Sequence, residues 1–180
     1  MNKPVDHLLN KEIDNQITIH RAITMLDNCT IQERWTGVNE LIERWLQARQ
    51  SIIVKFCDLS GIHEQRTETD SPSTRLQTFC QQLVDYLSAG HFEVYYELLR
   101  EAEAFADGSA DQAHALLPGI NATTAQAMAF NDRFVDAEGL LTTLPKSLSQ
   151  LGETLESRFE LEDQLIDLLH ESHREQVQVA

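Results

Sequence analysis

The stretch LVDYLSAGHFEVYY, residues 83–96, decides the fold of this chain. It lies inside a longer run in which apolar residues recur every three or four positions, the spacing that predicts an α-helix. Ser88, Ala89 and Gly90 place small side chains in the middle of that helix. A glycine in a helix interior costs about 1 kcal/mol relative to alanine. We therefore expect the helix to bend at this point or to admit a close neighbour.

The helix predicted over this stretch has an apolar face and a face of mixed character. His91 falls in line with the apolar residues, so we predict that its ring is directed inward. On the other side, Asp85 and Phe92 are seven residues apart, which is two turns of an α-helix. An acid and an aromatic side chain are therefore expected on one exposed face. The residues predicted on that face are Asp85, Ser88, Phe92 and Tyr96.

Helical spacing continues on both sides of this stretch. The predicted helices cover residues 32–60, 72–105, 123–141 and 145 onward, with a shorter piece over 111–117. Ser71 and Pro72 are typical of a helix start, and Pro118 is predicted to end the shorter piece. Strands are not expected, because no segment alternates apolar and polar residues. The sequence predicts an all-α protein, an antiparallel four-helix bundle of the up-and-down type.

The length of 180 residues suits one compact domain, which we place at residues 25–176. Residues 1–24 have a moderate helical pattern and are predicted to form an N-terminal helical extension. Residues 177–180 are expected to fray. The sequence has neither an apolar run of about 20 residues, the length of a membrane span, nor the apolar core of a signal peptide. We therefore expect a cytoplasmic protein without a membrane partner.

Acidic residues dominate the charge of the chain. Asp and Glu number 29 against 14 Lys and Arg, which gives a formal net charge of −15. Such a surface repels nucleic acid but attracts a cationic protein, such as one that itself binds DNA. We predict a basic protein partner and no direct nucleic-acid binding. The odd number of cysteines, 3, argues against a disulfide framework, and Cys57 and Cys80 are predicted to be core residues.

Ionisable residues occupy apolar positions in the predicted helices, namely Arg49, His91 and Glu162. Buried charges are tolerated chiefly when they are paired, and an arginine fork matches a carboxylate. We therefore predict that these residues meet in a buried polar network. The network either fixes the register of the helices or lines a pocket that shapes a binding surface or holds a small ligand.

The motifs of metal sites and of common enzymes are missing from the sequence. A di-iron bundle needs a glutamate three residues before a histidine on two helices, and none of the histidines has that spacing. A glycine-rich phosphate loop, a nucleophile elbow and the zinc-protease motif are also absent. We predict no enzyme activity, no metal site and no cofactor. The alternatives are a small-ligand or metal-binding bundle and a scaffold for another basic regulatory protein.

The exposed face around Phe92 is the predicted partner-binding surface. An aromatic anchor surrounded by acids is a suitable grip for a basic partner. Phe92 packing against a neighbouring helix is the alternative interpretation. The residues predicted to bind the partner are Asp85, Ser88, Phe92 and Tyr96, with Arg44 and Trp45 beside them from the first helix.

Three segments resemble the Rsd/AlgQ family of bacterial anti-sigma regulators: ERWTGVNELIERWLQAR (33–49), FCQQLVDYLSAGHFEVYYELL (79–99) and LGETLESRFELEDQLIDLL (151–169). The resemblance covers roughly residues 25–169 and implies a four-helix bundle. It implies binding to region 4 of the primary, housekeeping sigma factor, a basic helix-turn-helix domain, which is thereby sequestered from RNA polymerase core and the −35 promoter element. It also implies that Asp85 and Phe92 contact that domain. Residues 1–24 and 107–123 do not share the resemblance.

Overall fold

The computed structural model describes residues 31–61, 71–135 and 142–179. The chain forms two compact units, Met1–Glu43 and Arg44–Ala180. In the first unit, the described part is the beginning of helix α2 (Ile31–Leu59). The extension predicted over residues 1–24 lies outside the described residues.

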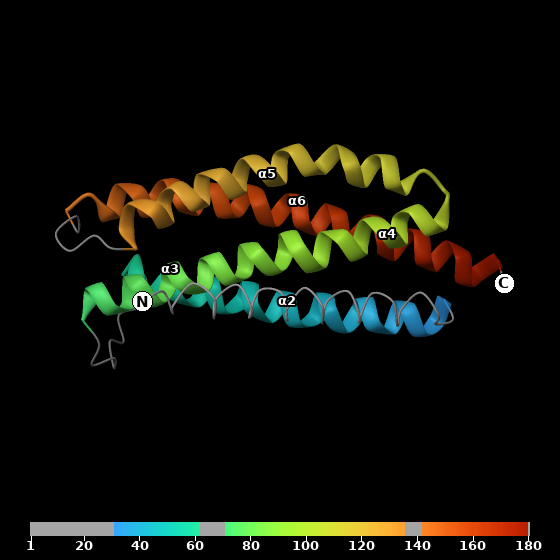
Figure 1. Cartoon of the computed structure of the whole chain (residues 1–180), viewed down its shortest axis with the longest axis horizontal. Helices are drawn as coiled ribbons and strands as arrows, with labels where there is room; N and C mark the ends of the chain where they lie inside the picture. Colours follow the sequence, from blue (N-terminus) through green and yellow to red (C-terminus); the bar gives the residue numbers. More distant parts are fainter. Residues whose placement is uncertain (1–30, 62–70, 136–141, 180) are drawn as a thin grey trace, which may run out of the picture. The chain divides into compact units, whose positions relative to one another are not determined.

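The second unit is a helical bundle. It contains the rest of α2, then α3 (Pro72–Ala89), η1 (Gly90–Val94), α4 (Tyr95–Phe105), α5 (Ser109–Phe134) and α6 (Leu144–Val179). The π-helical turn η1 joins α3 to α4 without a break, so these elements form one long rod. Within this unit, successive rods run in opposite directions (Figure 1). The predicted all-α, up-and-down four-helix bundle is confirmed, and the residues that the structure describes contain no strand.

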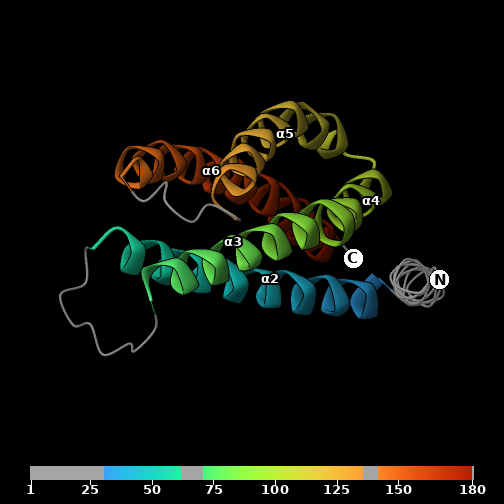
Figure 2. The ribbon, with the colours of Figure 1, turned by 60° about the vertical axis from the view of Figure 1, so that its left-hand side comes forward.

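The rods of this unit lie in two pairs that share a core. In both views α5 lies along α6, and the second half of α2 lies beside α3 (Figure 1, Figure 2). Helix α5 also contacts α3 and α4, and α4 contacts α6. Phe79 of α3 is fully buried and lies between Phe56 and Phe130, with ring centroids 6.3 and 6.2 Å away. Apolar side chains from both pairs therefore fill one interior.

Local signals set the ends of the helices. The Ser71 side chain accepts a hydrogen bond from the backbone N–H of Thr74 at 3.1 Å, and Pro72 follows as the first helical residue. Ala106 and Gly108, with φ of 55° and 91°, turn the chain between α4 and α5. The structure confirms the predicted helix start at residue 72 and the predicted helix end at residue 105.

The predicted break at Pro118 is wrong, because α5 continues through this residue. A proline inside a helix removes one backbone hydrogen bond and costs about 3 kcal/mol. The ring of Pro118 is exposed, while Ile120 is fully buried, so packing against the bundle keeps the helix intact. Gly119 permits a close approach to α6, since a Cβ there would lie 2.9 Å from Leu161 Cδ1.

The last two helices differ from their predicted spans at the ends. Helix α5 ends at Phe134, whereas the prediction extended to residue 141, and residues 136–141 lie outside the described part. Helix α6 begins at Leu144, one residue before the predicted start, and continues to Val179. Its backbone therefore remains helical into the segment 177–180 that is expected to fray.

Candidate functional site

A buried carboxylate, that of Glu162 in α6, is the centre of a polar network inside the bundle. Its Oε1 atom accepts a hydrogen bond from Tyr95 Oη at 2.6 Å and lies 2.7 Å from Arg158 Nε. Its Oε2 atom accepts a hydrogen bond from Arg49 Nη2 at 3.0 Å and another from Tyr86 Oη. Helices α2, α3, α4 and α6 therefore meet at one carboxylate, and Arg49 contacts Glu162 as the sequence leads us to expect.

The arginines of this network have further partners. Arg158 is fully buried and also donates from Nη2 to Tyr95 Oη at 2.7 Å and from Nη1 to Thr124 Oγ1 at 2.8 Å. Arg49 Nη1 pairs with Asp163 Oδ1 at 2.5 Å, and the Asp163 side chain is 58% exposed. The network therefore reaches α5 on one side and water on the other, and each guanidinium faces a carboxylate.

Aromatic rings surround the network. Trp45 of α2 is buried, stacks on Tyr86 with ring centroids 5.4 Å apart and meets Tyr95 edge-on at 5.6 Å. The Arg49 guanidinium carbon lies 4.8 Å from the centroid of the Phe159 ring. Such surroundings exclude water and strengthen the electrostatic interactions inside. The prediction that Trp45 lies on the exposed partner surface is wrong, because its ring fills the space beside these tyrosines.

Each titratable member of the network that shows a shift is held in one protonation state. Burial raises the pKa of Tyr86 and of Tyr95 well above the ordinary tyrosine value, and the charge of Glu162 raises both further. Both phenols are therefore protonated donors at physiological pH. Burial alone disfavours charged Arg49, but its neighbours Tyr86, Asp163 and Glu162 leave its pKa raised, so it stays charged. Tyr86, Tyr95 and Arg49 thus each keep a single protonation state at physiological pH.

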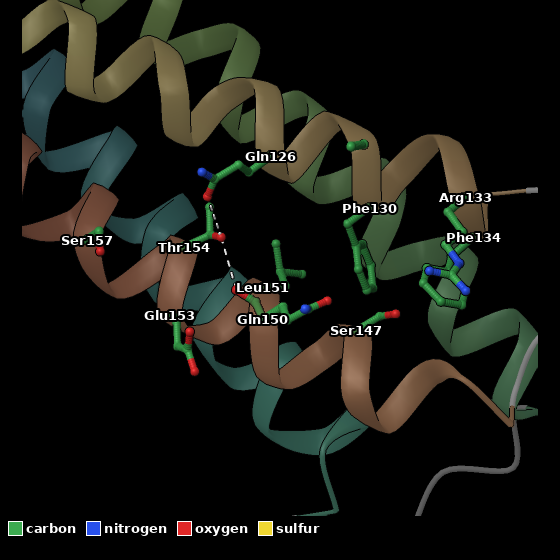
Figure 3. Close-up of a pocket in the computed structure, with 11 residues that line it drawn as sticks. Gln126, Phe130, Arg133, Phe134, Ser147, Gln150, Leu151, Glu153, Thr154 and Ser157 are labelled. Atoms are coloured by element: carbon green, nitrogen blue, oxygen red, sulfur yellow. Dashed lines mark hydrogen bonds between the residues drawn. The ribbon is translucent and has the colours of Figure 1, made fainter.

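A pocket of about 560 Å³ lies between α5 and α6 (Figure 3). The hydroxyl of Thr154 lies within it, 2.9 Å from Gln126 Oε1 and 3.0 Å from the carbonyl oxygen of Gln150. None of the residues that contact Glu162 lines this pocket. The lining residues are Gln126, Ala129, Phe130, Arg133, Phe134, Ser147, Gln150, Leu151, Glu153, Thr154 and Ser157.

His91 is exposed, so the prediction that its ring points inward and joins the network is wrong. The buried residues of η1 are Gly90 and Val94, and Gly90 directly precedes His91. A Cβ on Gly90 would lie 2.9 Å from Tyr95 Oη and 3.2 Å from Trp45 Cζ2. The expected close neighbour of the small residues is therefore present, and it is the phenol ring of Tyr95.

The predicted partner surface lies on α3, η1 and the beginning of α4. Phe92 is 68% exposed and Tyr96 is 50% exposed, so neither ring is buried in the bundle. Asp85 is exposed and Ser88 is half-buried. Arg44, at the start of the part of α2 that belongs to the second unit, is also exposed.

The backbone between Asp85 and Phe92 changes from α to π geometry. In η1 the backbone N–H of Tyr95 donates to the carbonyl oxygen of Gly90, five residues earlier. The wider turn means that a spacing of seven residues no longer equals two full α-helical turns. Asp85 and Phe92 are thus both exposed, but they are not stacked in the simple way that α periodicity predicts. Glu93, exposed within η1, is the acid next to Phe92 in the chain.

Sequence reasoning missed Tyr86, Tyr95 and Arg158, which supply most of the bonds to Glu162. Tyrosines at apolar positions are indistinguishable from ordinary core residues in a hydrophobic pattern. Arg158 carried a usable signal, because it precedes Glu162 by four residues, the spacing of neighbours on one helix face.

In the described residues, the cysteines and the possible metal ligands form neither a disulfide nor a metal site. Cys80 is fully buried, and burial raises the pKa of its thiol to about 11. Cys57 is half-buried, and neither thiol is in a disulfide. Within residues 31–61, 71–135 and 142–179, no group of three or more histidine, cysteine, aspartate or glutamate side chains could hold a metal ion. In those same ranges, no helix is long and apolar enough to cross a membrane.

Known proteins resemble most of this chain. A family profile described as "Regulator of RNA polymerase sigma(70) subunit, Rsd/AlgQ" matches residues 25–170. A protein named Regulator of sigma D from Yersinia pseudotuberculosis is 37% identical over 147 residues, which cover 79% of this chain and 87% of that protein. The Regulator of sigma D from Shigella boydii is 38% identical over 157 residues, covering 84% and 96%. The residues matched by the family profile contain both the polar network and the surface around Phe92.

Proposed function

The chain belongs to the Rsd/AlgQ family, and from that premise we propose that it is an anti-sigma regulator that binds region 4 of the primary, housekeeping sigma factor. Binding would withhold region 4 from RNA polymerase core and from the −35 promoter element. The family is one of regulators rather than of enzymes, so the proposed activity is binding in the cytoplasm, without catalysis and without a cofactor.

The observation that carries this proposal is the exposed aromatic pair Phe92 and Tyr96. The two rings lie four residues apart in η1 and α4, and 68% and 50% of their surface is open to water. Aromatic side chains are enriched among the anchors of protein interfaces, where they enter pockets on the partner and lose their water. The proposed role of the pair is to enter an apolar site on region 4.

Charge supports the same partner. The chain has a formal net charge of −15, and the exposed carboxylates of Asp85 and Glu93 lie in the same helical rod as the aromatic pair. A DNA-binding domain such as region 4 presents basic side chains to phosphate, and an acidic surface attracts those same side chains. Binding and promoter recognition would therefore compete.

Titration of fluorescently labelled sigma region 4 with the full-length chain tests this proposal. Phe92→Ala is expected to weaken binding by about 1 to 3 kcal/mol, which is roughly 5-fold to 150-fold in Kd, mainly through faster dissociation. Val54→Ala is the matched control, because Val54 is another exposed apolar residue, 44% exposed, on α2. It should bind like wild type.

Asp85 tests the electrostatic part of the proposal. Asp85→Ala is expected to reduce the dependence of the association rate on salt, because a carboxylate at the rim of an interface acts mainly through long-range attraction. Circular dichroism should show that each variant is folded. Identical curves for wild type, Phe92→Ala and Asp85→Ala at low and high salt would place the interface elsewhere.

The alternative function, a scaffold for some other basic protein, is distinguished from the anti-sigma function by comparing two basic domains as binding partners. An unrelated basic helix-turn-helix domain with the net charge of region 4 serves as competitor in the same titration. Preference for region 4 supports the anti-sigma function, whereas equal affinity for both domains would indicate a general binder of cationic proteins.

A further inference from the structure

We propose that Tyr95 and Gly90 are positioning residues for partner binding: the Tyr95 hydroxyl, held by Glu162, locks the π-helical turn η1, and η1 fixes how Phe92 is presented. The inference rests on the proposed binding of region 4 at Phe92. It adds to that surface two buried residues that a partner would not touch.

The turn is defined by a bond between these two residues. The backbone N–H of Tyr95 donates to the carbonyl oxygen of Gly90, whereas in an α-helix it would donate to that of His91. Single π-helical turns inside α-helices are rare and are frequently found at functional sites. A feature outside the backbone must therefore favour this hydrogen bond over the α-helical one.

That feature is the side chain of Tyr95. Its hydroxyl donates to Glu162 Oε1 at 2.6 Å and accepts from Arg158 Nη2 at 2.7 Å. Both partners belong to α6 and are fully buried, so they form a rigid anchor. While both bonds are kept, the first residue of α4 is fixed against α6. The π-helical turn before it accommodates one more residue than an α-helical turn would.

Gly90 provides the space that this arrangement needs. A Cβ at this position would lie 2.9 Å from Tyr95 Oη and 3.1 Å from its Cζ, and real Cβ atoms essentially never approach another atom to under 3.0 Å. The Gly90 backbone, with φ −56° and ψ −51°, has angles open to any residue. The requirement for glycine is therefore one of space, and the nearest atoms that need the space belong to Tyr95, with Trp45 Cζ2 next at 3.2 Å.

His91 connects the buried phenol with the exposed anchor. Its ring meets the Tyr95 ring edge-on at 6.5 Å and the Phe92 ring edge-on at 5.3 Å. If η1 relaxed to α geometry, residues after the turn would rotate by about 100°, the step of one residue, relative to α3. Tyr96, which follows the turn, would then face a different direction from Asp85, and Phe92, which lies inside the turn, would move with the relaxing backbone. A bond deep in the core thus sets the geometry of the surface.

The test compares Tyr95→Phe with Tyr86→Phe in the full-length chain. Each variant removes one phenolic hydroxyl from the same carboxylate, but Tyr86 lies in α3, outside η1. A 4-fluorophenylalanine placed at position 92 reports the environment of that ring by fluorine NMR. We expect Tyr95→Phe to shift or broaden this signal and to weaken region 4 binding at least about 5-fold. Tyr86→Phe should lower the urea midpoint but change neither readout.

Gly90→Ala perturbs η1 at its first residue and leaves every hydroxyl and charge of the network in place. It should shift the fluorine signal as Tyr95→Phe does, and it decides the question if Tyr95→Phe does not fold. An unchanged signal in the folded variants, or equal binding losses in Tyr95→Phe and Tyr86→Phe, would overturn the proposal. The fluorine signal at position 92 is measured in the absence of region 4. If the wild-type chain failed to bind region 4, the proposed function would be refuted, but the effect of Tyr95 and Gly90 on the Phe92 ring could still be measured.

Discussion

Replacing Glu162 by glutamine perturbs the polar network at its centre. The amide keeps the shape of the side chain but removes its charge, and the fully buried Arg158 loses the carboxylate that lies 2.7 Å from its Nε. Leaving a buried charge without its counterion costs about 3 to 5 kcal/mol. This is a large part of the total stability of a typical domain, about 5 to 15 kcal/mol.

The opposite replacement, Arg49→Met, is expected to cost less. Glu162 then keeps Arg158 and the hydroxyls of Tyr86 and Tyr95. The Asp163 side chain, which also loses Arg49, is 58% exposed and can return to water. The expected loss is that of a hydrogen bond to a charged group, about 1.5 to 3 kcal/mol. The double variant should be less harmful than the sum of the single variants, because the removed groups are partners.

Urea unfolding followed by circular dichroism measures these free energies, and equal m values make the comparison valid. The reasoning predicts that Glu162→Gln is the more destabilising single change and that the double-mutant cycle has a coupling energy of about 0.5 to 3 kcal/mol. Equal costs for the two single variants would show that Arg158 does not depend on Glu162. Strict additivity would show that Arg49 and Glu162 do not interact in solution.

Three further predictions concern other parts of the chain. Burial raises the pKa of Tyr86, of Tyr95 and, from 9.0 to about 11, of Cys80, so the folded state holds these protons more tightly. The free energy of unfolding in urea should therefore be unaffected by them below about pH 9 and fall at higher pH, and a constant value up to about pH 11 would contradict this. Gly90→Ala should lower the thermal midpoint despite the better helix propensity of alanine, since the methyl group meets the Tyr95 ring; a higher midpoint would mean that the ring moves freely. Deletion of residues 1–24, which precede the family match at residue 25, should leave thermal stability and region 4 binding largely intact, and a large loss of either would assign the segment to the bundle.

The helices themselves were largely predictable, because their signals are local. The start at Ser71 and Pro72 depends on a side-chain cap and a fixed backbone angle within a few residues. The failure at Pro118 has the opposite cause. A proline disfavours a helix locally, but the packing of neighbours such as Ile120 against the bundle outweighs that cost, and packing is not visible in a short window of sequence.

The candidate site was predictable where a residue looked out of place. Arg49 and Glu162 occupy apolar positions, and ionic groups there must find each other. Tyr86 and Tyr95 escaped notice, because an aromatic ring at an apolar position looks like any core residue and its hydroxyl leaves no periodic signal. His91 was misplaced for a geometric reason: the prediction assumed α periodicity, and the π-helical turn gives a buried position to Gly90 instead.

The convergence of Arg49, Arg158 and Glu162 restricts how this sequence can evolve. A neutral residue at position 162 leaves Arg158 unpaired, and a neutral residue at position 158 leaves a buried carboxylate with less compensation. An apolar core at these positions could be as stable as the polar one, yet each single step towards it passes through a less stable protein. Single substitutions in this network are therefore selected against, and its members are expected to change together or not at all.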